Sequence, residues 1–219
     1  MASQPQSSAA PPRGRRTAKV GAHEREAAIL ETAERLLEAR SPQEISVDDL
    51  ARGAGISRPS FYFYFPSKDA VFLTLIDRLV EQADAARGDV LERLPEDPPA
   101  MWRRGLQVFF ETFGAHRAVV LAGAQIRTAN AEARELWAEV MEHWVQDAAG
   151  AIESERARGA APPGPDARQL ATALVSMNER VMYATFAGDP PAVPEGAVMD
   201  VLLSIWLNAI YGTAGTVRD

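Results

Sequence analysis

The stretch from residue 45 to residue 70, ISVDDLARGAGISRPSFYFYFPSKDA, constrains the fold most strongly because it holds the start signals of two short helices in close succession. Ser46 stands at an N-cap position, and the two aspartates that soon follow place carboxylates near the positive end of a helix dipole. Gly55 can adopt the positive φ of a tight turn. Ser57 is a second N-cap candidate, and Pro59 follows where a missing N–H costs little. We therefore predict a helix-turn-helix.

The second short helix divides its side chains between two environments. Phe61 and Phe65 lie four residues apart, so they share one side of the helix and are predicted to be buried. The other side offers a guanidinium that can bond a guanine edge or a phosphate, and hydroxyls suited to phosphates or bases. The alternative is that the whole FYFYF run is core where three helices meet. The side chains of the motif that we predict to contact DNA are Ser46, Ser57, Arg58, Ser60, Tyr62, Tyr64 and Lys68.

A longer helix is predicted to begin directly after this motif. Ser67 can cap it, which places Lys68 in its first turn. A lysine there is electrostatically unfavourable unless a phosphate lies nearby, so we expect Lys68 to contact the DNA backbone. Apolar residues recur at helical spacing through residues 67–91, so this helix would begin at the DNA reader and end in the rest of the chain. Its length and position suit it to act as a lever.

The N-terminal residues 1–22 combine Pro, Ser, Ala and Gly with several cations and show no hydrophobic periodicity. We expect a disordered basic arm in which Arg13, Arg15 and Arg16 lie along DNA phosphates or reach into the minor groove. A solvated tail is the alternative.

The net charge of −7 is unevenly distributed along the chain. Residues 1–68 hold 10 Lys and Arg against 8 Asp and Glu, whereas residues 69–219 hold 13 against 22. An acidic body with a mildly basic head can orient itself on a polyanion, although ordinary acidic solvated faces explain the balance equally well.

The composition argues against several classes of protein. The chain has no cysteine, so neither disulfides nor thiolate metal sites can form, which fits a reducing cytoplasm. No apolar run approaches the roughly 20 residues that span a bilayer, so we expect no membrane contact. The three histidines are far apart, and no nucleophile motif or metal-ligand spacing occurs. We expect no catalytic residues, no metal and no cofactor.

The rest of the chain shows helical periodicity. Residues 24–39 carry apolar positions on one face and complete a three-helix head. No stretch alternates like a strand, and Pro- and Gly-rich segments mark the breaks. The predicted fold class is therefore all-α, with a helix-turn-helix head at 23–66 and a helical body at 67–219. Beyond the long helix, the expected helices cover 100–115, 119–129, 131–158, 166–187 and 195–211.

Two helices of the body carry large aromatic stripes. Such stripes form core more often than a binding site, but large rigid rings packed opposite one another tend to leave voids. Asn178 also lies on the apolar side of its helix, and a buried amide needs hydrogen-bond partners, of which a ligand carbonyl is one candidate. The stripes consist of Trp102, Leu106, Phe109, Phe110 and Phe113 on one helix and of Leu136, Trp137, Met141 and Trp144 on another.

At the helix-turn-helix the sequence resembles the TetR family of one-component transcriptional regulators. The signature of that family is a small residue and Ala-Gly before the turn, then a recognition helix that ends in an aromatic pair and Phe-x-Ser-Lys. GAGISRP at 53–59 and FYFYFPSK at 61–68 match it. PRGRRTA at 12–18, FFETFG at 109–114 and MNER at 177–180 resemble a repressor of the same family, so the resemblance spans nearly the whole chain.

This resemblance implies a body with a long, mostly apolar tunnel that grips hydrophobic ligands bearing a polar group. Val175 departs from the pattern where a second asparagine is expected, as do Asp147 and Ala148 where polar or aromatic residues are expected. We therefore expect a similar tunnel with a different ligand preference. The ligand-binding positions that the resemblance implies are Trp102, Phe109, Phe113, Trp137, Met141, Trp144, Asn178, Glu179, Tyr183 and Trp206, and Leu106 joins them from the first stripe.

The last two helices carry apolar stripes whose outer faces could pack against a second copy, and the resemblance also implies a homodimer through them. Two reader helices about 34 Å apart would match successive major grooves of a roughly palindromic operator in double-stranded DNA. The sequence thus predicts a cytoplasmic, dimeric repressor that a hydrophobic small-molecule effector releases from DNA. The alternative is a DNA-binding regulator without an effector pocket, whose body serves only dimerisation.

Overall fold

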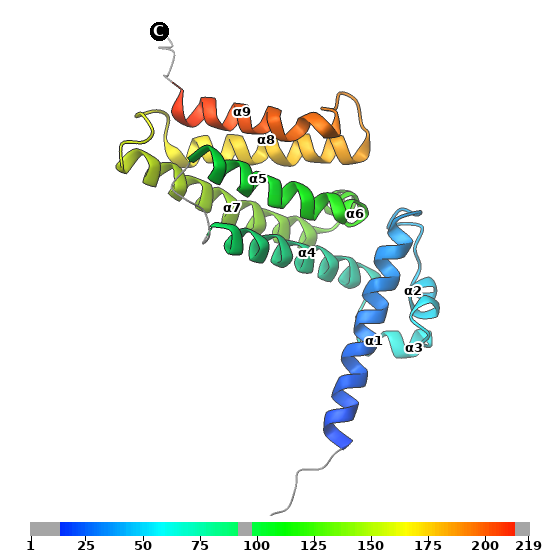
Figure 1. The fold of residues 1–219 in the computed structure, drawn as a ribbon. Coiled ribbons are helices and arrows are strands. Elements are labelled where there is room, and N and C mark those ends of the chain that lie inside the picture. The colour runs from blue at the N-terminus through cyan, green and yellow to red at the C-terminus, as the bar shows by residue number, and fades with distance from the viewer. Residues whose placement is uncertain (1–13, 92–97, 213–219) are drawn as a thin grey trace, which may run out of the picture.

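The computed structural model describes residues 14–91 and 98–212, which form helices and connecting turns with no strand (Figure 1). The all-α prediction is confirmed. Within these ranges no helix is both long enough and apolar enough to cross a membrane. The helices are α1 (Gly14–Leu37), α2 (Val47–Gly53), α3 (Arg58–Phe61), α4 (Lys68–Leu91), α5 (Pro98–Ala115), α6 (Arg117–Arg127), α7 (Ala131–Ala157), α8 (Ala167–Ala187) and α9 (Glu195–Tyr211).

The molecule consists of a head and a body (Figure 1). The head comprises α1, α2 and α3, and its α1 extends well beyond the two short helices. In the body, α5, α7, α8 and α9 run roughly alongside one another. The helix α4 joins the two parts, since it contacts α1 in the head and α5 in the body, and α6 contacts both α1 and α4.

The first helix begins earlier than the sequence analysis predicted. The expected disordered arm covered residues 1–22, but α1 starts at Gly14, so the prediction is wrong for residues 14–22. Residues 14–37 contain no proline, so nothing in the backbone interrupts the helix. Their first turns lack apolar periodicity because this end of α1 projects away from the other helices (Figure 1). Residues 1–13, which include Arg13, lie outside the described residues.

A continuous core runs from the head into the body along α4. The predicted apolar stripe of α4 is buried at every expected position, from Val71 and Phe72 near its start to Leu79 and Val80 further along. Its hydroxyl cap is also as predicted, since Ala70 N donates to Ser67 Oγ at 3.1 Å. The same helix therefore contributes to the core of both parts.

Lys68 fastens the head to the start of α4. Its Nζ donates to the backbone oxygens of Pro42 and Ile45, both at 2.9 Å, and lies 3.4 Å from that of Gln43. These carbonyls belong to the loop between α1 and α2, so one ammonium closes the head around the first turn of α4. An ammonium has three donors, and this one is directed at three carbonyls, so the predicted phosphate contact would require Lys68 to give up one of these bonds.

We predict that Lys68→Met destabilises the protein by about 1–3 kcal/mol, because partly buried carbonyl oxygens lose their charged donor. Chemical denaturation followed by circular dichroism measures this change. The control is Arg52→Met in α2, which removes an exposed cation from the same head. An equal loss in both variants would show that net charge, not the loop anchor, determines the effect.

Candidate functional site

Two caps shape the helix-turn-helix. Ser46 Oγ accepts from Asp49 N at 3.1 Å, and Asp49 Oδ2 accepts from Ser46 N at 3.0 Å, which forms a capping box at the start of α2. Hydrogen bonds from the Ser46 hydroxyl and backbone, and then from Arg40, lower the pKa of Asp49 well below its usual range. The N-cap predicted at Ser46 is confirmed. Its hydroxyl is held within the cap, so any effect of Ser46 on DNA is through the position of α2.

The turn between α2 and α3 also forms as the sequence predicts. Gly55 has a φ of 67°, the left-handed conformation that glycine adopts without steric cost. Ser57 Oγ accepts from Ser60 N at 3.2 Å, and the two serine hydroxyls lie 2.8 Å apart. This cap fixes the first turn of α3 and sets the direction in which its exposed side chains point.

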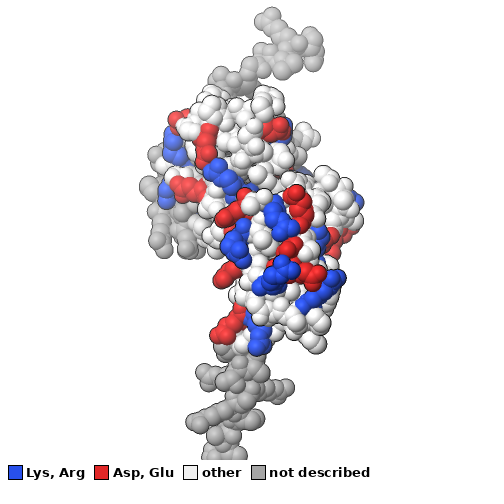
Figure 2. All heavy atoms as spheres, turned by 90° about the vertical axis from the view of Figure 1, so that its right-hand side faces the viewer, with Lys and Arg blue, Asp and Glu red and all other residues white. Residues whose placement is uncertain are grey.

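Arg58 is an exposed guanidinium at the start of α3, and it has intramolecular partners. Its Nη1 donates to Asp48 Oδ2 at 3.0 Å, across the turn on α2. A side-chain hydrogen bond with Tyr62, and then the charge of Asp48, raise the pKa of Arg58. Figure 2 shows Lys and Arg interspersed with Asp and Glu on this side of the molecule, so the head presents individual cations and not a continuous basic surface.

The FYFYF run is divided between core and solvent. Phe61 and Phe65 are buried, as predicted, and Tyr64 is partly buried against the same core. Tyr62 is 48 % exposed and Phe63 is 87 % exposed. Phe63 is not among the predicted DNA contacts, although its position two residues from each buried phenylalanine indicates that it faces away from them.

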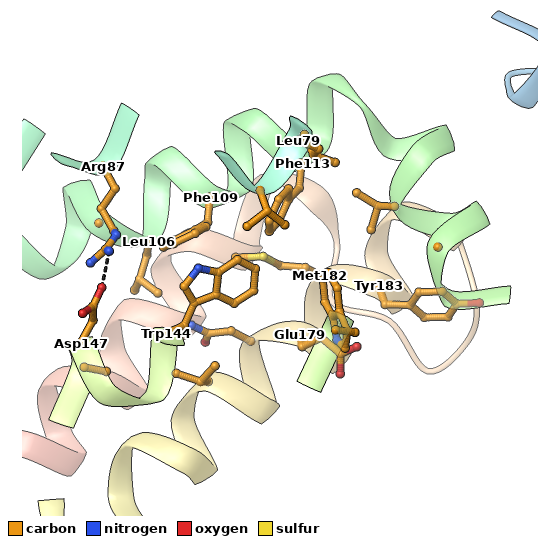
Figure 3. A pocket seen from close by; sticks show the side chains of 18 of the residues that line it. Leu79, Arg87, Leu106, Phe109, Phe113, Trp144, Asp147, Glu179, Met182 and Tyr183 are labelled. Carbon is orange, nitrogen blue, oxygen red and sulfur yellow. Dashed lines mark hydrogen bonds and ion pairs between the residues drawn. The ribbon is translucent and has the colours of Figure 1, made fainter. Parts of the chain in front are cut away.

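The body encloses a cavity of about 200 Å³ that is bordered by side chains from α4 to α9 (Figure 3). Ten of the predicted ligand-binding residues line it, and so do the three departures Val175, Asp147 and Ala148. The aromatic stripes are therefore both core and cavity wall. The predicted residues that line it are Trp102, Leu106, Phe109, Phe113, Trp137, Trp144, Asn178, Glu179, Tyr183 and Trp206.

Met141 is not among the residues that line this cavity, so the structure does not place it as predicted. It falls between Trp137 and Trp144 on α7, and these two indoles meet edge to face with ring centroids 5.8 Å apart. The larger rings thus occupy the wall of the cavity, while Met141 packs against the core as a partly buried residue.

Asn178 presents a polar group to the cavity. Its Oδ1 accepts from Trp206 Nε1 at 3.0 Å, and among the described residues its Nδ2 has no hydrogen-bond partner. The amide is thus fixed in orientation by a tryptophan, with a donor left over for a ligand. The residue that the sequence marked as a buried amide therefore has a protein partner for its oxygen only.

A chain of hydrogen bonds also holds Trp102 in the cavity wall. Trp102 packs against Trp206 with ring centroids 5.0 Å apart and donates from Nε1 to the Tyr211 hydroxyl at 2.9 Å. Tyr211 in turn donates to Glu155 Oε2 at 2.7 Å. Burial and this bond to a carboxylate raise the pKa of Tyr211 to about 12. The two tryptophans are therefore held by polar contacts as well as by packing.

Four charged residues also border the cavity, in two ion pairs. Arg87 pairs with Asp147, and Arg127 Nη2 donates to Glu179 Oε1 at 2.8 Å. The guanidinium of Arg127 also stacks over the Trp137 ring, 4.5 Å from its centroid. Sequence reasoning missed both arginines, because their acidic partners lie 60 and 52 residues away and no local signal joins them. Within the described ranges, no group of three or more acidic or histidine side chains is arranged to hold a metal ion.

Known proteins resemble this chain over both of its parts. The family described as bacterial regulatory proteins, tetR family, matches residues 29–75, and the family described as transcriptional regulator EthR, C-terminal domain, matches residues 102–212. The HTH-type transcriptional regulator EthR of Mycobacterium tuberculosis (strain ATCC 25618 / H37Rv) is 56 % identical over 211 residues, which are 94 % of this chain and 96 % of the relative. EthR of Mycolicibacterium smegmatis is 51 % identical over 92 % of this chain and 93 % of its own.

Solved structures share the fold at lower identity. The fatty acid degradation regulator FadR from Bacillus halodurans superposes with a TM-score of 0.71 at 16 % identity, over 89 % of this chain and 97 % of FadR. A transcriptional regulator from Saccharomonospora viridis, solved in complex with choline, gives 0.72 at 24 % identity, over 85 % of this chain and 96 % of its own. The high identity to EthR and the two family matches show that this chain belongs to the TetR family of transcriptional regulators.

Proposed function

We propose that this regulator is a repressor that binds a palindromic operator as a homodimer and is released when a hydrophobic small molecule enters the body cavity. The observation that supports this most is the position of α4. Its first turns contribute Val71 and Phe72 to the buried core beside α1, and its later turns contribute Ile76, Leu79 and Val80 to the cavity wall. A ligand in the cavity therefore touches the helix on which the head stands.

The DNA-reading surface in this proposal is the exposed side of the helix-turn-helix. Arg58 is suited to a guanine edge, and Phe63 to a thymine methyl group. The hydroxyls of Ser57, Ser60, Tyr62 and Tyr64 are suited to phosphates, which fix the register of the head on the duplex. Arg15 and Arg16, in the first turn of α1, remain predicted phosphate contacts.

The dimer in this proposal forms through α8 and α9. Val201 and Ile205 of α9 are 37 % and 40 % exposed, an apolar pair four residues apart that a second copy could cover. A two-fold arrangement of α8 and α9 would give a four-helix interface. It would also place two heads so that each α3 can enter one of two successive major grooves.

Release from DNA would follow from a shift between two arrangements of α4. The wall is tight where α4 meets α6, since a Cβ added at Gly123 would lie only 3.0 Å from Ile76 Cδ1. A ligand that widens the cavity therefore favours the arrangement with α4 displaced, and with it the head. The alternative, a body that serves only dimerisation, does not explain why a cavity bordered by a donor amide lies against this helix.

Arg58→Ala is predicted to weaken operator binding by about 1–3 kcal/mol and to relax specificity at the base that Arg58 contacts. A footprint on the DNA beside the gene identifies the operator, and fluorescence anisotropy then measures affinity for it and for random DNA. Arg103→Ala is the matched control, because Arg103 is also exposed and paired with an aspartate, Asp200 at 3.3 Å, on the body. Equal losses in both variants would contradict a reader role for Arg58.

Phe63→Ala and Phe61→Ala are predicted to have opposite effects. The exposed Phe63 should leave the unfolding free energy nearly unchanged but lower operator affinity by about an order of magnitude. The buried Phe61 should cost about 3–5 kcal/mol of stability, because its loss leaves a cavity in the head. Denaturation and anisotropy on both variants separate the two roles. Operator affinity unchanged in Phe63→Ala would remove this residue from the reading surface.

A bound hydrophobic ligand is predicted to raise the melting temperature saturably and to lower operator affinity by about 5–150-fold, the range typical of allosteric coupling. Thermal shift across a ligand panel finds the binders, and anisotropy with and without a saturating binder measures the coupling. If a ligand stabilises the protein but leaves operator affinity unchanged, the release mechanism is wrong. The body then binds the ligand without an effect on DNA.

A further inference from the structure

The cavity is apolar along most of its length but has a charged pair near each end. In Figure 3, Arg87 and Asp147 lie at one end, beside Phe109 and Trp144, whereas Glu179 lies toward the other. The two ends come from different helices, since α4 and α7 supply the first pair and α6 and α8 the second. Each pair is neutral as a unit, so the difference between them lies in the other charged groups around each guanidinium.

Both guanidinium groups pair with a carboxylate and lie over an aromatic ring. Arg127 donates to Glu179 at 2.8 Å and lies over the Trp137 ring. Arg87 Nη2 donates to Asp147, its Cζ lies 6.0 Å from the centroid of the Phe109 ring, and its Nε is buried without a hydrogen-bond partner among the described residues. A guanidinium offers more donors than one carboxylate oxygen can use, and a buried donor without an acceptor is costly. The buried Nε is closed off from the cavity, so a further acceptor at this end would bond the Nη groups of the guanidinium.

The charge around Arg87 decides what kind of acceptor fits. Asp84 Oδ1 lies 4.0 Å from Arg87 Nη2 and also accepts from Trp144 Nε1 at 3.1 Å. His143 Nε2 lies 3.6 Å from Asp147 and 3.9 Å from Asp84, and its side chain is half exposed. Two carboxylates therefore already surround one guanidinium, and a ligand carboxylate would be a third anion beside them. A neutral oxygen can accept from the guanidinium without adding charge.

We propose that the end of the cavity at Arg87 is a polar subsite that takes a neutral oxygen acceptor, the carbonyl of an amide or ester, at one end of a hydrophobic effector. Asp147 and Asp84 make this subsite reject a free carboxylate. The inference rests on the proposed function of the cavity as an effector site, and it adds the chemical class of the effector and the residues that select it.

Three probes with the same apolar chain test the proposal: N-methyldecanamide, decanoate and decylamine, each titrated against the whole protein by calorimetry. The wild type should bind the amide at least about 10-fold more tightly than either charged probe. Arg87→Met should remove about 10-fold of the amide affinity, because it keeps the apolar stem but lacks the donors. Asp147→Asn should strengthen decanoate binding by a similar factor, because it removes one of the two carboxylates that repel a ligand carboxylate.

Glu179→Gln is the matched control, since it removes a carboxylate from the pair at the other end of the cavity. It should leave the order of the three probes unchanged, because Arg127 remains stacked on Trp137. The subsite is wrong if decanoate or decylamine binds the wild type best, if Arg87→Met binds the amide as tightly as the wild type, or if Glu179→Gln strengthens decanoate as much as Asp147→Asn. In each of these cases the cavity still binds ligands, so the proposed ligand site stands while the subsite does not. Binding of no probe to any variant would overturn the effector function and the subsite together.

Discussion

One apolar stripe on α4 holds the head and the body together. Its first residues are buried beside the head and its later residues in the body. Val71 and Phe72 are buried beside the head, whereas Ile76, Leu79 and Val80 form part of the cavity wall in the body. A helix packed at both ends cannot move at one end alone, because close-packed side chains have few alternative arrangements. Lys68 strengthens this coupling, since its ammonium ties the loop before α2 to the first turn of the same helix. The head is thus fixed to α4 by both packing and hydrogen bonds.

Close contacts between aromatic rings keep the walls of the cavity apart. Phe109 contacts Trp144 with ring centroids 4.9 Å apart, and Trp144 in turn meets Trp137. Large flat rings held edge to face fill space poorly, and polar bonds such as that from Trp206 to Asn178 stop them from rotating inward. A ligand therefore loses little free energy to ordering these rings, and the widening that we propose falls on the side of the cavity formed by α4.

Much of this arrangement could be predicted from the sequence because its signals are local. The caps at Ser46 and Ser57, the positive φ of Gly55 and the stripe of α4 each depend on residues within one or two turns. The features that sequence reasoning missed depend on long-range contacts. Lys68 bonds carbonyls 23 and 26 residues before it, and Arg87 pairs with an aspartate 60 residues away. The early start of α1 was not predicted, because the part of a helix that projects from the fold has no packing partner and so needs no regular spacing of apolar residues.

In the free protein, Arg58 of α3 is paired with Asp48 of α2. A guanidinium held at 3.0 Å by a carboxylate in the free protein must leave that carboxylate before it can bond a base. The proposed recognition of DNA is then an exchange of partners, and its free energy is the difference between a guanine edge and Asp48. On a non-operator sequence Arg58 can keep its aspartate, whose negative charge repels the phosphates. In the proposed mode of DNA recognition, the same acidic residue would shorten the time that the regulator spends on the wrong DNA.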